Sequence, residues 1–186
     1  MNDTNPNLLI RFHGIDGNMR TLVQNDSSLV NRTLVDLHPA RIFTQYRIRV
    51  TDGDSPISIF PSLTTRVDLI TDRLSVWDYP FLIGALRELE KTAFERRCHD
   101  PEPKERVDPQ IDFPIFFDVE MLGGQHVFLW MEVIAGMPAE RLARVYSIFK
   151  RRYLIFGLKN NGIGILNLAN MVGFLVDLAP PEQIAA

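Results

Sequence analysis

The stretch from Asp112 to Lys159 constrains the fold more than any other part of this chain. In its first half, apolar residues recur with a two-residue period on both sides of Gly123-Gly124, a pair that readily supplies the positive φ angles of a two-residue hairpin turn. In its second half the period changes to the roughly 3.6 residues of an amphipathic helix. The sequence therefore predicts a β-hairpin that leads directly into a helix.

A two-residue turn at this position would fix which residues of the hairpin face each other. One face would then be aromatic and aliphatic, with Met121, Val119, Phe117 and Ile115 opposite His126, Phe128, Trp130 and Glu132. The other face would be half apolar, with Phe116, Asp118, Glu120 and Leu122 opposite Met131, Leu129, Val127 and Gln125. We expect the first face to lie against the core and the second to be covered only in part.

The helix that follows is predicted to span about 138–157. Pro138 suits the first helical position, and Gly157 or the Asn160-Asn161-Gly162 run would end the helix. Beside its apolar stripe lies a basic arc with two isoleucines set into it. The residues of this arc that we single out as a binding surface are Arg141, Arg144, Ile148, Arg151, Arg152 and Ile155.

Two further helices are predicted from apolar residues at helical spacing. One spans about 78–97, with Asp78 as a plausible N-cap, and the other spans about 164–178. Between the first of them and the hairpin, residues 98–111 contain three prolines and mostly charged side chains. We expect this stretch to be a mobile surface loop.

The N-terminal part of the chain reads mainly as strands. Residues 8–13 and 19–24 flank a Gly-Ile-Asp-Gly-Asn turn and predict a first hairpin. Residues 41–51 alternate apolar residues with arginines, and short strands are expected at 57–60 and 66–71. Residues 27–37 fit either period, and their β-branched content favours a strand. The overall expectation is an α+β fold, with a mainly antiparallel sheet of about five to seven strands, a central amphipathic helix and two C-terminal helices.

Composition is that of an ordinary globular protein, since 46% of the 186 residues are hydrophobic and 23% are charged. A chain of this length suits a single domain over 1–186. We expect no transmembrane segment, because the most hydrophobic stretch, 163–176, is interrupted by Gly and Asn. The N-terminus lacks the pattern of a secretory signal, and the single cysteine, Cys98, excludes an intramolecular disulfide. These features favour a cytoplasmic location.

Charge is spread unevenly along the chain, whose net charge is −3. Residues 1–135 carry 14 Lys and Arg against 20 Asp and Glu, whereas residues 136–186 carry 6 against 3. This asymmetry indicates a contact surface on the C-terminal third. Arg41, Arg47 and Arg49 also gather on one predicted strand face, which keeps nucleic-acid binding open, but a pI near 5.8 disfavours a dedicated nucleic-acid binder.

No strong catalytic or cofactor motif is present, and the histidines lack the spacing of metal ligands. We therefore expect no cofactor and no metal, and we lean away from an enzyme. The weak catalytic candidates are Asp118 and Glu120, because residues two apart on a strand point to the same side and paired carboxylates can share a proton. A solvated sheet face explains the same pair more simply.

Three functions stay open at this level. The leading hypothesis is a non-enzymatic protein-binding, assembly or adaptor domain that binds a partner protein or itself through the basic helix and the half-apolar hairpin face. Small bacterial immunity, adaptor and assembly proteins share this general profile. The second hypothesis is an enzyme or small-ligand binder with a site at Asp118 and Glu120. The third is a nucleic-acid-binding module.

Overall fold

The computed structural model of the protein describes residues 7–52, 55–71, 86–99, 113–133, 138–160 and 162–178. Strands make up most of these residues. The strands are β1 (Leu8–Gly14), β2 (Met19–Gln24), β3 (Ile48–Asp52), β4 (Ser55–Ile59), β5 (Thr64–Ile70), β6 (Leu86–Leu89), β7 (Phe113–Met121), β8 (Gln125–Val133), β9 (Tyr153–Gly157), β10 (Ile163–Asn167) and β11 (Met171–Leu178). The helices are α1 (Ser27–Asp36), α2 (Pro39–Ile42), α3 (Lys91–His99) and α4 (Pro138–Phe149), with 3-10 turns η1 (Pro61–Leu63) and η3 (Leu168–Asn170).

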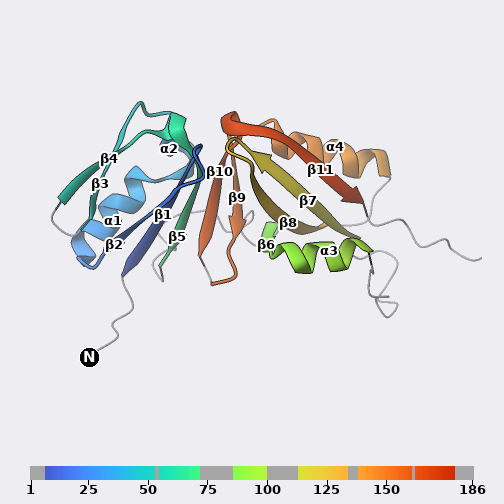
Figure 1. The fold of residues 1–186 in the computed structure, drawn as a ribbon, viewed down its shortest axis with the longest axis horizontal. Helices are drawn as coiled ribbons and strands as arrows, with labels where there is room; N and C mark the ends of the chain where they lie inside the picture. The colour runs from blue at the N-terminus through green and yellow to red at the C-terminus, as the bar shows by residue number, and fades with distance from the viewer. Residues whose placement is uncertain are drawn as a thin grey trace, which may run out of the picture.

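Nine strands form one mixed sheet in the order β11-β7-β8-β6-β9-β10-β5-β1-β2, and β3 and β4 form a separate two-stranded ribbon. Neighbours in the large sheet are antiparallel except for β6 and β9, which pair in parallel. The two hairpins, β1–β2 and β7–β8, therefore lie toward opposite ends of the sheet, with β9 and β10 between them (Figure 1).

The sheet carries a separate hydrophobic core on each of its two faces. Consecutive residues of a strand point to opposite faces, and in β9 the neighbours Leu154 and Ile155 belong to different buried clusters. The first cluster is covered by α1, α2 and the β3–β4 ribbon through Val30, Leu34, Leu37, Ile42, Ile48, Val50 and Ile59. The second is covered by α4 through Val145, Ile148 and Phe149. The central strands are consequently buried on both sides.

The predicted α+β fold with a central helix and two C-terminal helices is wrong, because the described residues are mostly strand. The stretch predicted as the last helix forms β10, η3 and β11, and the preceding helix ends at Phe149 instead of near 157. All five residues of β10 are buried, so that strand lacks the apolar-polar alternation by which a strand is usually recognised. Of the central helix, residues 86–89 form β6, 91–99 form α3, and 78–85 lie outside the described residues.

The second hairpin is confirmed, but its predicted register is wrong by one residue. Its loop has three residues, Leu122-Gly123-Gly124, and both glycines have positive φ angles of 86° and 72°. A Cβ on Gly123 would overlap the carbonyl oxygen of Ile15 in the first hairpin, so this position requires glycine. The shift puts Val127, Leu129 and Met131 on the core face. It moves His126, Phe128 and Trp130 to the face that carries Asp118 and Glu120.

The N-terminal predictions have mixed outcomes. The first hairpin and the two short strands are confirmed as β1–β2, β4 and β5. Residues 27–36 form a helix and not a strand, because the Asp26 carboxylate caps it by accepting a hydrogen bond from the Ser28 N–H at 2.7 Å. The strand expected over 41–51 begins only at Ile48, after α2. In the expected mobile loop, residues 98 and 99 end α3, and 100–111 lie outside the described residues.

None of the helices in the described part of the chain is long and apolar enough to cross a membrane.

Candidate functional site

Helix α4 lies against β11, at the end of the nine-stranded sheet (Figure 1). The Phe149 ring stacks on the Phe174 ring of β11, with centroids 3.9 Å apart and planes inclined by 10°. Val145 of α4 is buried in the second core. Just after the helix, the Arg152 carbonyl accepts a hydrogen bond from the Leu168 N–H at 3.0 Å. Because Leu168 opens the η3 turn that leads into β11, this bond holds the basic end of α4 near the start of β11.

Only some residues of the predicted basic arc are exposed in the structure. Arg151 and Arg152 are exposed, as is Lys150 beside them, and Ile148 is half-buried against the second core. Arg141 and Arg144 belong to α4, but their side chains lie outside the described part of the structure. Ile155 does not belong to the arc. It lies in β9, where it is 6% exposed and packs in the first core. Its assignment to a binding surface is therefore wrong.

The outer edge of β11 is the most apolar exposed feature near this helix. β11 is the last strand of the sheet and pairs only with β7 among the described residues. Val172 is 58% exposed and Leu175 is 72% exposed. Tyr146 of α4 is 49% exposed and contacts the ring of Phe174 in β11 edge-on, with the centroids 5.8 Å apart. Leu122 is also exposed, and its N–H donates to the Asn170 carbonyl at 2.8 Å, just before β11.

We call this region the free-edge surface. It consists of Leu122, Tyr146, Lys150, Arg151, Arg152, Val172 and Leu175. Sequence reasoning missed its strand because residues 164–178 were interpreted as a helix. The available signal was the run of β-branched and aromatic residues around Gly173, which is typical of a strand.

Asp118 and Glu120 do share one face of the sheet, as predicted, and they are joined there by His126. The Nδ1 atom of His126 lies 2.7 Å from Oδ1 of Asp118. Phe128 stacks beside the imidazole at 6.1 Å and is itself contacted at 4.9 Å by Phe94 of α3. Within the described ranges, no group of three or more His, Cys, Asp and Glu residues could hold a metal ion. A catalytic role for the carboxylates stays a prediction.

A second charged cluster crosses the middle of the sheet and was not foreseen. Arg66 of β5 binds Asp68 through Nε and Nη2, at 2.6 and 3.1 Å, and reaches Glu88 of β6 at 2.6 Å. His13 of β1 contacts the same Asp68 at 3.0 Å. The Arg66 guanidinium also lies 5.1 Å from the centroid of the Phe156 ring. Because β10 and β9 separate β5 from β6, this cluster joins the two halves of the sheet.

Burial and neighbouring charges shift the pKa values of Asp68 and Arg66 in opposite directions. The Asp68 side chain is only 3% exposed, and burial, the largest effect, raises its pKa. Hydrogen bonds and charge from His13 and Arg66 together outweigh burial and leave the pKa of Asp68 below its ordinary value. Burial lowers the pKa of Arg66, but Asp68 and Glu88 reverse that effect and raise it. The cluster is therefore a charged network at the centre of the sheet, and its four residues are too dispersed in sequence to form a motif.

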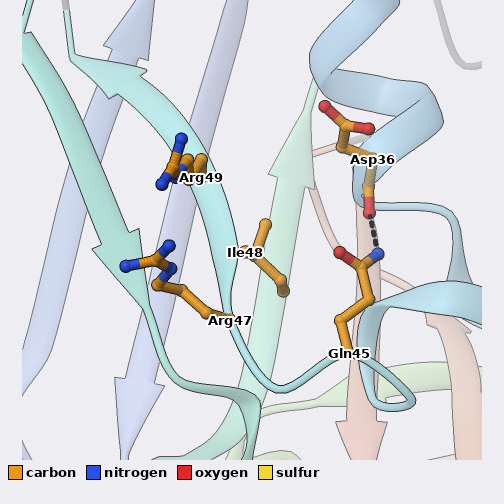
Figure 2. A pocket seen from close by; sticks show the side chains of 5 residues that line it. All are labelled: Asp36, Gln45, Arg47, Ile48 and Arg49. Atoms are coloured by element: carbon orange, nitrogen blue, oxygen red, sulfur yellow. Dashed lines mark hydrogen bonds between the residues drawn. The ribbon is translucent and has the colours of Figure 1, made fainter.

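A shallow hollow lies beside β3, in the N-terminal half (Figure 2). Its volume is about 260 Å³, and it is lined by Asp36, Gln45, Arg47, Ile48 and Arg49. The Gln45 side-chain amide donates to the Asp36 carbonyl at 3.4 Å across one side of it. The predicted strand face of three arginines is not found, because Arg49 lies in β3, Arg47 just precedes that strand, and Arg41 lies in α2.

Comparisons with protein-family models, with curated proteins and with solved structures find no match to this chain.

Proposed function

We propose that the protein works by binding another protein through the free-edge surface. The observation that carries the proposal is that β11, an edge strand of eight residues, leaves Val172 and Leu175 largely in water. Natural sheets usually protect such edges with charged residues, prolines or a covering element. An edge that is apolar and uncovered by any described strand is suited to accept a strand from a partner.

The shape of the partner follows from the backbone of β11. An edge strand presents a row of N–H and C=O groups with the spacing of a β-ladder, and an extended segment satisfies that row. Alternate side chains of the added strand then point to the two faces of the sheet. Tyr146 lies above one of these faces, and Leu175, opposite Asp118 in the β7 pairing, lies on the other.

The charge of the partner follows from the basic end of α4. Lys150, Arg151 and Arg152 are exposed next to the start of β11, and no ion pair joins any of them to another described residue. An acidic segment would place carboxylates against these cations and would associate faster at low salt. The proposed partner is therefore an extended segment in which apolar residues alternate with Asp or Glu.

A designed peptide tests this proposal directly. The probe is a fluorescent peptide as long as β11 in which Val alternates with Glu, and its binding is measured by fluorescence anisotropy. We expect saturable binding that weakens about tenfold or more when Val172→Asn and Leu175→Asn are combined, because both side chains lose apolar contact. The matched control combines Met19→Asn and Thr21→Asn, exposed positions on the opposite edge strand, β2. The control should bind like the unchanged protein.

Two outcomes would reject the proposal. The first is equal binding by a peptide in which Lys replaces Glu, which would show that the cations play no part. The second is self-association of the unchanged protein in sedimentation velocity that is lost when Val172 and Leu175 are both changed to Asn. The occupant of the edge would then be a second copy of this chain and not an acidic partner. A cytoplasmic location stays a prediction.

A further inference from the structure

The β3–β4 ribbon has one buried face and one face in water. Ile48 and Val50 of β3 point into the first core, where Ile59 of β4 pairs with Ile48. Arg49, between them in sequence, is exposed, and so is Arg47, the residue before Ile48. Arg47 lies just before β3, and both arginines line the same hollow. Figure 2 shows both guanidinium groups on the side of β3 that faces away from Asp36.

Neither arginine is neutralised by a described neighbour. No ion pair within 4.0 Å joins Arg47 or Arg49 to a carboxylate in the described part of the chain, although Asp36 lines the same hollow. The formal charge of the residues that line the hollow is therefore positive, whereas the net charge of the chain is negative. Two adjacent unpaired guanidiniums are suited to bind phosphate oxygens, because their planar forks match the geometry of those oxygens.

An exposed aromatic residue precedes these arginines in sequence. Tyr46 immediately precedes Arg47 and is 86% exposed. Its ring packs edge-on against Phe60, with centroids 5.8 Å apart and planes inclined by 82°. This contact fixes Tyr46 at the end of the ribbon without covering it. A large aromatic residue held in place but left so exposed offers a stacking surface for a flat ligand.

We propose that this face binds single-stranded nucleic acid, with Arg47 and Arg49 on the phosphates and a base stacked on Tyr46. Unpaired cations next to an aromatic platform are the combination by which proteins bind single strands without reading sequence. The hollow of about 260 Å³ is smaller than the roughly 300–1,000 Å³ of pockets that enclose small molecules. It therefore suits a chain that passes over the surface. This activity is separate from the protein binding proposed for β11.

Fluorescence anisotropy with a labelled oligouridylate tests the site. We expect binding at low salt that weakens steeply as salt is added. Combining Arg47→Ala with Arg49→Ala should lower the slope of log affinity against log salt by about 1.4, since each phosphate contact to a single strand contributes about 0.7. Tyr46→Ala should weaken binding by about tenfold and leave the salt slope unchanged, whereas Tyr46→Phe should keep the affinity. All three residues are exposed, so the thermal midpoint should change little.

The matched control combines Arg20→Ala with Arg96→Ala, which removes two exposed arginines from other elements. It should keep the salt slope of the unchanged protein. The proposal is overturned if the oligonucleotide does not bind at low salt, or if Tyr46→Ala and the Arg47/Arg49 double variant bind like the control. Loss of binding on changing Arg151 and Arg152 instead would place the nucleic acid at α4. The peptide experiment on β11 is independent of each of these results.

Discussion

The two edges of the nine-stranded sheet are built differently. At β2, the Val23 N–H donates to the Asp52 carboxylate at 3.4 Å, and the Gln24 side chain donates to the Thr51 hydroxyl at 2.9 Å. Residues at the end of β3 thus cover part of that edge. At β11, no described residue provides such a cover, and the exposed side chains include Val172 and Leu175. Among the described residues, the fold therefore covers one edge in part and leaves the other open.

Between the two edges, the charged network of Arg66, Asp68, Glu88 and His13 joins β5 to β6 across the centre of the sheet. Changing Asp68→Ala should lower the free energy of unfolding by about 3–5 kcal/mol, because it removes one partner of a buried ion pair and strips Arg66 and His13 of their shared carboxylate. Urea unfolding measures this. Glu95→Ala, which removes an exposed pair with Lys91 at 3.7 Å, should cost less than about 0.5 kcal/mol.

The same network predicts a pH dependence with a defined sign. Since the folded state lowers the pKa of Asp68 below its ordinary 3.8, the stabilisation is complete above that value. It is lost as the pH falls through the lower folded pKa. The difference in stability between the unchanged protein and Asp68→Ala should therefore be constant near neutral pH and should narrow below pH 3.8. A difference that grows on acidification would contradict this account.

Two glycines, Gly164 at the centre of the sheet and Gly173 at its open edge, differ in the space that surrounds them. A Cβ on Gly164 of β10 would overlap the Phe156 ring, which also carries the Arg66 guanidinium. Gly164→Ala should therefore destabilise the protein by about 1–3 kcal/mol through overpacking. A Cβ on Gly173 of β11 would meet no atom within 4 Å, and Gly173→Ala should change stability by less than about 0.5 kcal/mol. Thermal unfolding of the two variants compares them, and equal losses would show that the edge is as tightly packed as the centre.

A smaller effect on binding is predicted for the cations beside the open edge. Combining Arg151→Ala with Arg152→Ala should weaken binding of the acidic peptide by about fivefold at low salt, because exposed charges contribute only about 0.2–1 kcal/mol each. The difference should shrink at high salt, where such charges are screened. Titrations at several salt concentrations measure it. The same loss at every salt concentration would mean that the arginines act through packing and not through charge.

The sequence predicted the strands beside clear turns better than it predicted β9 and β10, for a physical reason. β1, β2, β4 and β5 lie near turns rich in Gly, Pro, Asn or Asp, which mark strand ends. β10 is buried on both faces, so its apolar residues are not separated by polar ones and also fit a helix. The residues of β9 are predicted as part of the helix over 138–157, because Tyr153 and Phe156 continue the helical spacing of apolar residues in α4.

Of the candidate site, the sequence predicted the exposure of some individual side chains but not the features that depend on strand register or strand order. The exposure expected for Arg151 and Arg152 is found, whereas Ile155 turned inward once its segment proved to be a strand. The face of Phe128 and Trp130 depended on whether the loop at Gly123 had two residues or three, which the paired glycines alone do not decide. An edge strand and a network such as Arg66, Asp68 and Glu88 are properties of sheet order, which no local pattern contains.

Amide hydrogen exchange, measured with and without the acidic peptide, tests the central claim most directly. In the free protein, the outward N–H groups of β11 lack a partner among the described residues and should exchange quickly. With the peptide bound, we expect these amides to exchange at least about tenfold more slowly, while those of β2 do not change. Protection that appears in β2, or a bound peptide that leaves β11 unprotected, would contradict the account.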